Sequence, residues 1–369
     1  MSAVEPPVRV GLVGCGNISG IYLANAKRLP ELAVVACADL VPERARAAAA
    51  AHGVPRACSP EELLADPEVE VILNLTVPCA HAAVARAVLL AGKSVYNEKP
   101  LAIRREEGRE LLDLARERGL RVGGAPDTFL GGSHQTCRRL VDEGAIGVPV
   151  AATAFMVCHG HEGWHPDPAF YYEEGGGPLF DMGPYYLTAL VNLLGPVRRA
   201  CASARITFPA RTIASEPKRG QTIRVETPTH VAGVLDFVSG AVASLVMSFD
   251  VWHASLPPIE VHGEAGSLSV PDPNAFGGPV RLRRAADREW TEVPATGGPL
   301  DNARGLGLAD LARTLRTGGE PRASGELAYH VLDVMHALLE SSEGGRHVEV
   351  ASRCARPAAM GADSGEARP

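Results

Sequence analysis

The chain has 369 residues, of which 46% are hydrophobic, 21% charged and 5% aromatic. At roughly 100–200 residues per domain, this length predicts two domains with sizeable cores. The 36 Lys and Arg residues against 43 Asp and Glu residues give a formal charge of −7, which disfavours nucleic acid as the main partner. No apolar run reaches the roughly 18–20 residues of a membrane span. The first residues also lack the basic and apolar regions of a signal peptide.

Cysteine usage indicates a reducing compartment. The eight cysteines form no CxxC motif and no paired spacing; they are Cys15, Cys37, Cys58, Cys79, Cys137, Cys158, Cys201 and Cys354. Such scattered residues are typical of reduced, mostly buried thiols. We therefore expect a cytoplasmic protein without a membrane partner.

Short apolar runs alternate with helical stretches through the first third of the chain. Strands are expected at residues 8–13, 32–38, 69–77, 94–97 and 120–123. Helices are expected from the glycines after residue 13 to about 29, and at 43–52, 60–65, 80–92 and 104–118, with Ser59 as the N-cap of the third. This alternation predicts βαβ units. Residues 1–127 are thus expected to form an α/β Rossmann domain with a doubly wound parallel sheet.

The pattern changes after about residue 127. Helices are expected at 133–143 and from the glycine-rich turn at 175–177 to about 194, and two more at 306–317 and 324–342. Strands are expected at 149–158, 200–207, 230–237, 241–249 and 259–262, with further runs near 268 and 280. Ser239 and Gly240 read as a hairpin turn. These patterns predict an α+β domain over residues 128–352 with a mostly antiparallel sheet, and a disordered tail over 353–369.

A glycine motif follows the first expected strand. Gly14 and Gly16 precede Asn17, Ile18 and Ser19 in a GxGxxS version of the dinucleotide fingerprint. The glycines permit a tight turn and close approach of the backbone to a pyrophosphate at a helix N-terminus. Ser19 is small enough to replace the third glycine. The alternative is a glycine-rich turn in another kind of α/β protein.

The second expected strand ends at Asp39, about 20 residues beyond the glycines. A carboxylate there accepts hydrogen bonds from the ribose 2′-OH of NAD and repels the 2′-phosphate of NADP. Leu40 follows it, where an NADP site would more often have Arg. The sequence therefore favours NAD, although Arg44 and Arg46 could still reach a phosphate. The alternative role for Asp39 is a helix N-cap.

Two more motifs follow strands, where open α/β sheets bind their ligands. Thr76, Pro78 and His81 come after the third strand, and Glu98 and Lys99 come after the fourth. The tripeptide Glu-Lys-Pro would carry little weight alone, because it could be an ordinary surface segment. Behind the glycine motif, we assign these five residues to the cofactor site.

Together these motifs resemble the glucose–fructose oxidoreductase, inositol dehydrogenase and rhizopine-catabolism (Gfo/Idh/MocA) family. The resemblance covers residues 8 to about 350 and continues through GGGPLFD at 175–181, HGEAGSL at 262–268 and SGELAYHVLDVMHALL at 324–339. It implies an NAD-dependent oxidoreductase acting on a secondary alcohol of a sugar, sugar derivative or cyclitol. It also implies a homodimer or homotetramer. Consistent with that, runs such as VAGVLDFV are apolar at nearly every position, so both sheet faces need cover.

The resemblance assigns three catalytic residues, Lys99, Asp181 and Tyr185, with Tyr185 where the family usually has His. Spacing of i,i+4 places Asp181 and Tyr185 on one helix face. Pro184 favours a first helical turn, which would place Asp181 near the helix N-terminus. A phenol, with an ordinary pKa of about 10, could transfer a proton beside an ammonium group. Either Lys99 or Tyr185 could then move the proton, or Tyr185 could be a core aromatic.

The segment 159–165 carries His159, His161, Glu162 and His165 within seven residues. Such a group suits zinc, but its glycines and the prolines after it predict a flexible loop. We therefore favour a substrate-lining loop without a metal, in which His161, Trp164 and His165 join Lys99, Asp181 and Tyr185. Trp164, Tyr171 and Tyr172 could stack on a sugar or pack against the sheet. A plain solvated loop is the remaining alternative.

Three rival functions remain open at this point. One is a redox-neutral glycosidase that uses bound NAD⁺ for transient sugar oxidation. Another is a non-catalytic cofactor-binding regulator, which would not need Lys99 and Asp181. The third is a metal-dependent hydrolase built on the 159–165 segment.

Overall fold

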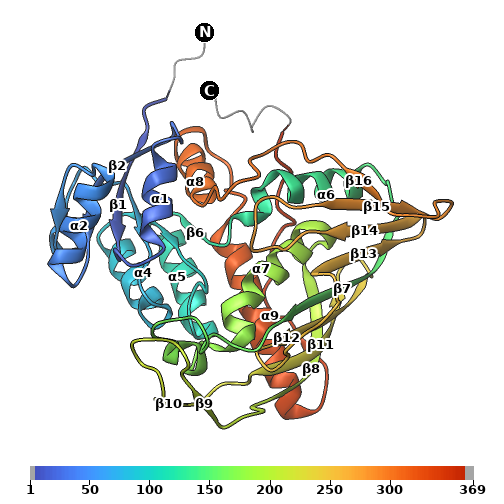
Figure 1. The fold of residues 1–369 in the computed structure, drawn as a ribbon. Helices are drawn as coiled ribbons and strands as arrows, with labels where there is room; N and C mark the ends of the chain where they lie inside the picture. Colours follow the sequence, from blue (N-terminus) through green and yellow to red (C-terminus); the bar gives the residue numbers. More distant parts are fainter. Residues whose placement is uncertain (1–4, 362–369) are drawn as a thin grey trace. The chain divides into compact units, whose positions relative to one another are not determined.

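The computed structural model describes residues 5–361, which divide into two compact units (Figure 1). Unit 1 comprises residues 5–130 and Asp301–Tyr329, and unit 2 comprises Gly131–Leu300 and residues 330–361. The second unit is therefore not the contiguous segment 128–352 that we predicted. Residues 301–329 return to unit 1, where Asn25 Nδ2 donates to the carbonyls of Asn302 and Arg304, each at 2.9 Å.

Unit 1 contains a six-stranded parallel sheet in the order β3-β2-β1-β4-β5-β6. Its strands are β1 (Val8–Val13), β2 (Leu32–Ala38), β3 (Ala57–Cys58), β4 (Val71–Asn74), β5 (Ser94–Asn97) and β6 (Val122–Gly124). The apolar runs that predicted the strands are buried, since a parallel sheet is covered on both faces. The Rossmann prediction is confirmed, and the sequence analysis missed only the two-residue β3.

The helices of unit 1 follow the strands as expected. They are α1 (Ser19–Ala26), α2 (Pro42–His52), α3 (Pro60–Ala65), α4 (His81–Leu90), α5 (Arg105–Glu117) and α8 (Leu306–Thr317), with short 3₁₀ turns η1 (Pro78–Ala80) and η2 (Thr128–Leu130). Ser59 caps α3 in both directions: its Oγ accepts from Glu62 N, and its N–H donates to the Glu62 carboxylate. The predicted N-cap is confirmed.

Unit 2 is built on a nine-stranded sheet in the order β16-β15-β14-β13-β7-β12-β11-β8-β17. The strands are β7 (Pro149–Val157), β8 (Val197–Arg205), β11 (His230–Phe237), β12 (Val242–Ser248), β13 (Ile259–Gly263), β14 (Gly266–Val270), β15 (Val280–Arg284), β16 (Thr291–Val293) and β17 (Val348–Glu349). Every pairing is antiparallel except that of β7 with β12. The predicted hairpin joins β11 to β12, with Phe237 N donating to Ala241 O.

Three helices accompany this sheet: α6 (Gly132–Asp142), α7 (Gly177–Leu194) and the part of α9 (Gly325–Gly344) that follows Tyr329. Helix α7 packs on β7, β11 and β12. In β12 the side chains of Ala243, Leu245 and Met247 are fully buried, whereas Val242 and Ser244 are exposed and Val246 is half-buried. The burial along β12 therefore alternates, although its sequence is apolar at most positions.

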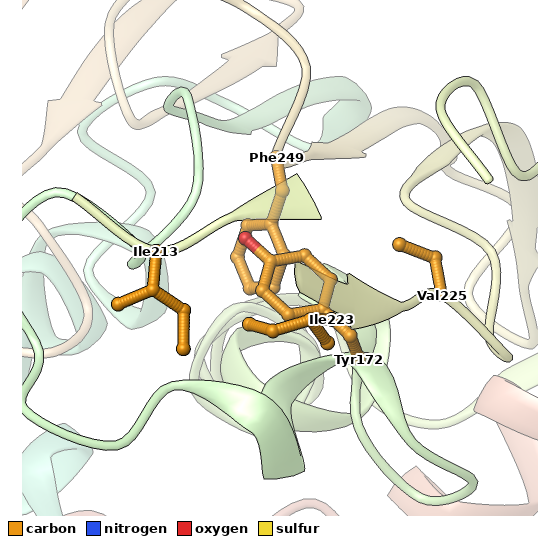
Figure 2. Packing of buried hydrophobic residues seen from close by; sticks show 5 residues of the cluster. All are labelled: Tyr172, Ile213, Ile223, Val225 and Phe249. Carbon is orange, nitrogen blue, oxygen red and sulfur yellow. The ribbon is translucent and has the colours of Figure 1, made fainter. Parts of the chain in front are cut away.

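A second, two-stranded sheet lies in unit 2, formed by β9 (Ala210–Thr212) and β10 (Thr222–Arg224). Strands of three residues are too short to show a hydrophobic period, so the sequence analysis missed them. Figure 2 shows the small core that this region builds, in which aliphatic side chains pack with two aromatic rings; its members are Tyr172, Ile213, Ile223, Val225 and Phe249.

Two expectations about helix starts and the tail are wrong. Pro184 lies inside α7, because the glycine-rich turn starts the helix at Gly177 and Pro178 occupies the first turn. Residues 353–361 are packed in unit 2 and not disordered. Arg138 Nη1 donates to Pro357 O at 2.7 Å, and Met360 N donates to Gln135 Oε1 at 2.9 Å. The rest of the predicted tail, residues 362–369, lies outside the described residues.

In the part of the chain that the structure describes, no helix is both long and apolar enough to cross a membrane.

Candidate functional site

The glycine motif forms the turn between β1 and α1. Gly14 has a φ of +94°, and a Cβ there would lie 2.6 Å from Leu75 O, so only glycine fits. A Cβ on Gly16 would meet nothing within 4 Å, and Gly16 and Asn17 are exposed. Ser19 is buried, and its Oγ donates to Gly16 O at 2.6 Å. The turn is therefore tight on its inner side and open on its outer side, as a pyrophosphate requires.

A cavity of about 550 Å³ lies beside this turn, within unit 1. Its volume is in the range of small-molecule sites. Most of its lining is aliphatic, with Asp39, Arg44 and Thr76 as polar members; the aliphatic side chains are Val13, Leu40, Val41, Leu63, Leu64, Ile72, Leu75, Val77, Val84 and Val88. An apolar wall with one carboxylate suits the base and the ribose of a dinucleotide, so the residues present fit NAD.

Asp39 stands at the end of β2, where its carboxylate accepts two backbone hydrogen bonds. Oδ2 accepts from Cys15 N and Oδ1 accepts from Val41 N, both at 2.8 Å. The N-cap of α2 is Val41, whose side chain makes no cap hydrogen bond, so Asp39 does not have the N-cap role. Arg46 pairs with Glu43, whereas Arg44 lines the cavity. Of the two arginines, Arg44 is thus the one beside Asp39.

Buried amides join the ends of β4 and β5. Asn74 Nδ2 donates to Asn97 Oδ1 at 2.9 Å, and Asn97 Nδ2 donates to Leu101 O at 3.1 Å. Asn74 Oδ1 accepts from Thr76 Oγ1 at 2.7 Å. The loops that carry Thr76 and Lys99 are therefore tied to each other through side chains of the two strands.

His81 completes this connection. Its Nδ1 lies 2.7 Å from Pro100 O and its Nε2 lies 2.9 Å from Thr76 O. A neutral imidazole carries one N–H, so it can donate to only one of these carbonyls. Burial lowers the pKa of His81, while the two carbonyls and Glu98 act in the opposite direction. His81 thus holds the Thr76 loop and the Lys99 loop together from the interior of unit 1.

Glu98 lies beside Lys99 and is itself fixed by two donors. Its Oε1 accepts from Tyr22 Oη at 2.9 Å and its Oε2 accepts from Lys99 N at 2.8 Å. Burial raises the pKa of Tyr22, and the neighbouring Glu98 adds to the effect. Asp127 accepts from Gly305 N and Gly307 N at the start of α8, and burial raises its pKa to about 6. Sequence reasoning missed Tyr22 and Asp127, because neither stands in a motif.

Helix α7 carries the two candidate catalytic residues of unit 2. Asp181 lies in its second turn and Tyr185 one turn later, where Tyr185 is 7% exposed. Asp181 faces a residue from another element: its Oδ2 lies 3.6 Å from His161 Nε2. The side chains of Asp181 and His161 are 14% and 11% exposed. Lys99 belongs to unit 1, whereas Asp181 and Tyr185 belong to unit 2.

Aromatic rings surround His161. Its ring centroid lies 4.0 Å from that of Tyr171, 4.7 Å from that of Phe249 and 5.3 Å from that of Trp164. Trp164 is 65% exposed. The structure thus places Trp164 and Tyr171 beside His161, whereas Tyr172 belongs to the small core.

Ion pairs fix the segment that follows His161. Glu162 accepts from Tyr172 Oη and from Arg211 Nη1, the latter at 2.8 Å, and Arg211 also pairs with Asp250. The Arg211 side chain is 5% exposed. Burial opposes ionisation of Glu162, but hydrogen bonds from Tyr172 and Arg211 outweigh burial and lower its pKa. This segment is held by buried charges, so it is not a plain solvated loop.

The three histidines of the segment point to different partners. The His159 ring stacks on Trp252 with a centroid distance of 3.4 Å, and His165 Nδ1 accepts from Asp167 N at 3.0 Å. Among residues 5–361, no group of three His, Cys, Asp or Glu side chains is arranged to hold a metal ion. The metal alternative therefore gains no support from this geometry. Arg211 and Phe249 gave no signal in the sequence, because both reach the site through tertiary contacts.

Two regions of the chain match known families. Residues 8–124 match an oxidoreductase family with an NAD-binding Rossmann fold, and residues 134–269 match the GFO/IDH/MocA C-terminal domain. The chain is similar to a 1,5-anhydro-D-fructose reductase of Ensifer adhaerens, with 29% identity over 93% of this chain and 98% of that protein. It is 30% identical to a dTDP-3,4-didehydro-2,6-dideoxy-alpha-D-glucose 3-reductase of Streptomyces violaceoruber, over 87% of this chain and 91% of that protein.

Solved structures share the fold. An NAD binding oxidoreductase from Klebsiella pneumoniae has a TM-score of 0.82 and 23% identity, covering 94% of this chain and 100% of that chain. A levoglucosan dehydrogenase in complex with NADH and levoglucosan has a TM-score of 0.79 and 22% identity, with the same coverage. The two matched family regions, the similar relatives and the glycine turn beside its cavity all indicate the same family. The chain belongs to the Gfo/Idh/MocA family of NAD(P)-dependent oxidoreductases.

Proposed function

We propose that this protein transfers a hydride between a nicotinamide cofactor and a secondary alcohol of a neutral sugar, sugar derivative or cyclitol. The observation that carries the proposal is the cavity beside the Gly14–Gly16 turn. Asp39 and Thr76 line it, and buried amides tie the Thr76 loop to the Lys99 loop. Several relatives carry names of reductases or dehydrogenases that act on sugars or sugar derivatives, which supports this substrate class.

When bound, NAD supplies the hydride acceptor. Gly14 and Gly16 would lie against its pyrophosphate and Asp39 against its ribose, while the aliphatic wall would hold the base. Asn17, Ile18, Thr76 and Pro78 belong to the same loops. We propose that NAD binds more tightly than NADP, because the Asp39 carboxylate would repel a 2′-phosphate. Arg44 is the one side chain of this rim that would act in the other direction.

Lys99, Asp181 and Tyr185 are the proposed catalytic residues. In the direction of oxidation, Lys99 or Tyr185 would take the hydroxyl proton while Asp181 holds the substrate. Positioned proton transfer of this kind contributes about 10²–10⁴ in rate. Tyr185 is 7% exposed, so only a small part of its side chain could meet the substrate. Lys99 is half-buried and follows Glu98, whose two donors fix the start of the loop.

The test is a turnover assay in both directions. The protein would be incubated with NAD⁺ and a panel of sugars, glycosides and inositols, and with NADH and the corresponding ketoses, while the absorbance of NADH is followed. Net formation or consumption of NADH with at least one neutral polyol is the expected result. Glycoside cleavage without net NADH would identify the redox-neutral glycosidase instead. Cofactor binding without turnover of any compound would favour the regulator.

We also propose that the chain forms a homo-oligomer through the face of the large sheet opposite α7. On β7 and β12 the pairs Val242–Ala151 and Val246–Phe155 share this face. Val242 is 45% exposed. The Thr153 hydroxyl on the same face is buried and has no hydrogen-bond partner among the described residues. Light scattering should give a dimer or tetramer, and Val246→Glu should reduce its mass; a wild-type monomer at micromolar concentration would contradict the proposal.

A cytoplasmic location is proposed from the cysteines. None of the eight, which lie within the described residues, forms a disulfide, and burial raises the pKa of Cys137. Thiol titration of the denatured protein purified without reductant should find eight reactive groups, and pairs of missing thiols would contradict this.

A further inference from the structure

We infer that His161 and Asp181 form a matched donor–acceptor pair that grips one hydroxyl group of a neutral cyclic polyol, with His161 as a specificity-determining residue. This inference rests on the proposed function and assigns the part of the substrate that unit 2 recognises. His161 Nε2 and Asp181 Oδ2 are 3.6 Å apart, which is longer than a direct hydrogen bond of about 2.7–3.2 Å. An oxygen atom placed beside the two can lie about 2.8 Å from each, within hydrogen-bond range of both.

The proton of His161 determines what this gap accepts. A carboxylate only accepts hydrogen bonds, and His161 Nε2 faces one. His161 Nδ1 is buried and has no hydrogen-bond partner among the described residues. We therefore assign the N–H of the neutral ring to Nε2, since a proton on Nδ1 would be buried without an acceptor. A hydroxyl in the gap would accept from Nε2–H and donate to Asp181 Oδ2, so all three groups would be satisfied.

The backbone of the segment fixes this orientation. His161 O accepts from Trp164 N at 3.3 Å and from His165 N at 2.9 Å, which closes a turn after His161. Before it, Gly160 has a φ of +81°, and a Cβ there would lie 2.3 Å from both the Glu162 carboxylate and Tyr172 Oη. The His161 ring packs against both Tyr171 and Phe249. The imidazole is thus preorganised toward Asp181.

The surroundings select a neutral ring over an anion. Arg211 is the buried cation nearest in this network, and its guanidinium is committed to Glu162, Asp250 and the carbonyl of Phe249. Asp181 itself would repel a phosphate or carboxylate. Trp164, exposed and 5.3 Å from the His161 ring centroid, offers an apolar face for the C–H groups of the ring. Neither Arg211 nor Asp181 would therefore stabilise an anionic group at this hydroxyl.

The first experiment does not depend on turnover. Nitrogen-15 spectra of the whole protein, with His161 assigned by comparison with His161→Phe, report which ring nitrogen carries the proton. The expected result is Nε2–H, a shift of this signal in Asp181→Asn, and a shift on adding at least one of levoglucosan, D-glucose and myo-inositol but not D-glucose 6-phosphate. A proton on Nδ1, or a signal indifferent to all three neutral probes, would overturn the inference.

The second experiment measures specificity. His161→Phe keeps an aromatic ring in the cluster and removes the donor, so kcat/KM for a neutral polyol should fall about tenfold. The same comparison is made with 2-, 3- and 4-deoxy-D-glucose. With the deoxy sugar that lacks the gripped hydroxyl, the kcat/KM values of His161→Phe and wild type should agree within about twofold, because the donor has nothing left to bind. His159→Phe is the matched control, because His159 stacks on Trp252 and should change little. Equal losses of kcat/KM in His161→Phe and His159→Phe would overturn the inference. The proposed function would still stand in that case, provided that the wild-type protein turns over the polyol.

Discussion

The two units hold their functional groups in different ways. In unit 1 several partners lie in the same loop: Asp39 binds Val41 N, Thr76 binds Asn74, and His81 lies against the Thr76 carbonyl. Longer-range contacts, such as that of Tyr22 with Glu98, support these loops from behind. In unit 2 the partners come from distant segments, as with Glu162 and Arg211, which are 49 residues apart. The first arrangement follows from where strands end, whereas the second depends on tertiary packing.

The chemistry of support differs as well. Around the Lys99 loop of unit 1 it consists mainly of neutral hydrogen bonds among amides, carbonyls and an imidazole, each contributing about 0.5–1.5 kcal/mol net. Around His161 it includes a buried guanidinium between two carboxylates. Removing one member of a buried ion pair typically costs about 3–5 kcal/mol, because the partners remain charged and desolvated. A single polar substitution should therefore cost more stability around His161 than around the Lys99 loop.

The largest expected effect concerns catalysis and tests whether both units contribute. Lys99→Ala in unit 1 and Asp181→Ala in unit 2 should each lower turnover by about 10²–10⁴-fold. NAD affinity, measured by intrinsic fluorescence, should stay nearly unchanged in both. Tyr185→Phe separates the two proton-transfer alternatives: a loss as large as that of Lys99→Ala assigns the step to Tyr185, and a mainly raised KM assigns it to Lys99. Wild-type turnover in all three would mean that the catalytic residues are misplaced.

The next effect tests the stability of unit 2. Arg211→Met should lower the free energy of unfolding by about 3–5 kcal/mol, because Glu162 and Asp250 lose their shared cation. Arg199→Met is the matched control, since Arg199 is 38% exposed and its pair with Asp236 should contribute less than about 1 kcal/mol. Hydrogen exchange would locate the loss in unit 2. Similar losses in the two variants would remove the contrast between buried and surface pairs.

A third effect, of at most about 3 kcal/mol per group, gives the two units opposite pH dependence. In unit 1 burial raises the pKa of Asp127 to about 6, so folded Asp127 keeps a proton that the unfolded chain has released. Stability of unit 1 from this group falls as pH rises from about 4 to about 6. In unit 2 burial lowers the pKa of His330 to about 4. The unfolded chain then binds the extra proton, and stability rises from about pH 4 to about 6.5.

Hydrogen exchange in each unit, followed between about pH 4.5 and 7, would measure both slopes. Asp127→Asn should flatten the slope of unit 1, because an amide oxygen can still accept from Gly305 and Gly307 but does not titrate. His330→Gln should flatten that of unit 2 and leave unit 1 unaffected. Slopes of the same sign in both units, unchanged by these variants, would contradict the assignment.

The smallest expected effect concerns the cofactor. Asp39→Ala removes the acceptor at the rim of the cavity, so NAD binding should weaken about tenfold and NADP binding should improve. Arg44→Ala should act in the opposite direction on NADP. Titration of both cofactors by fluorescence checks the pair. A wild-type preference for NADP would show that Arg44 outweighs Asp39.

The sequence placed the candidate groups of unit 1 at the ends of strands because its signals there are local. Gly14, Asp39 and Lys99 each follow an apolar strand, and strand order then brings them to one edge of the sheet. For unit 2 the sequence identified His161 and Asp181 separately but could not bring them together. It missed Arg211 and Phe249, since strands of three residues and a lone buried arginine show no periodicity. The prediction that Pro184 lies in the first turn of its helix was wrong, because Pro178 already occupies that turn.

The central claim is that Lys99 of unit 1 and Asp181 of unit 2 act in the same reaction. A double-mutant cycle measures this directly: kcat/KM is determined for wild type, Lys99→Ala, Asp181→Asn and the double variant with one neutral polyol from the panel. If both act on one transition state, the double variant should be little worse than the poorer single variant, so the losses are strongly non-additive. Losses that multiply independently would contradict the claim.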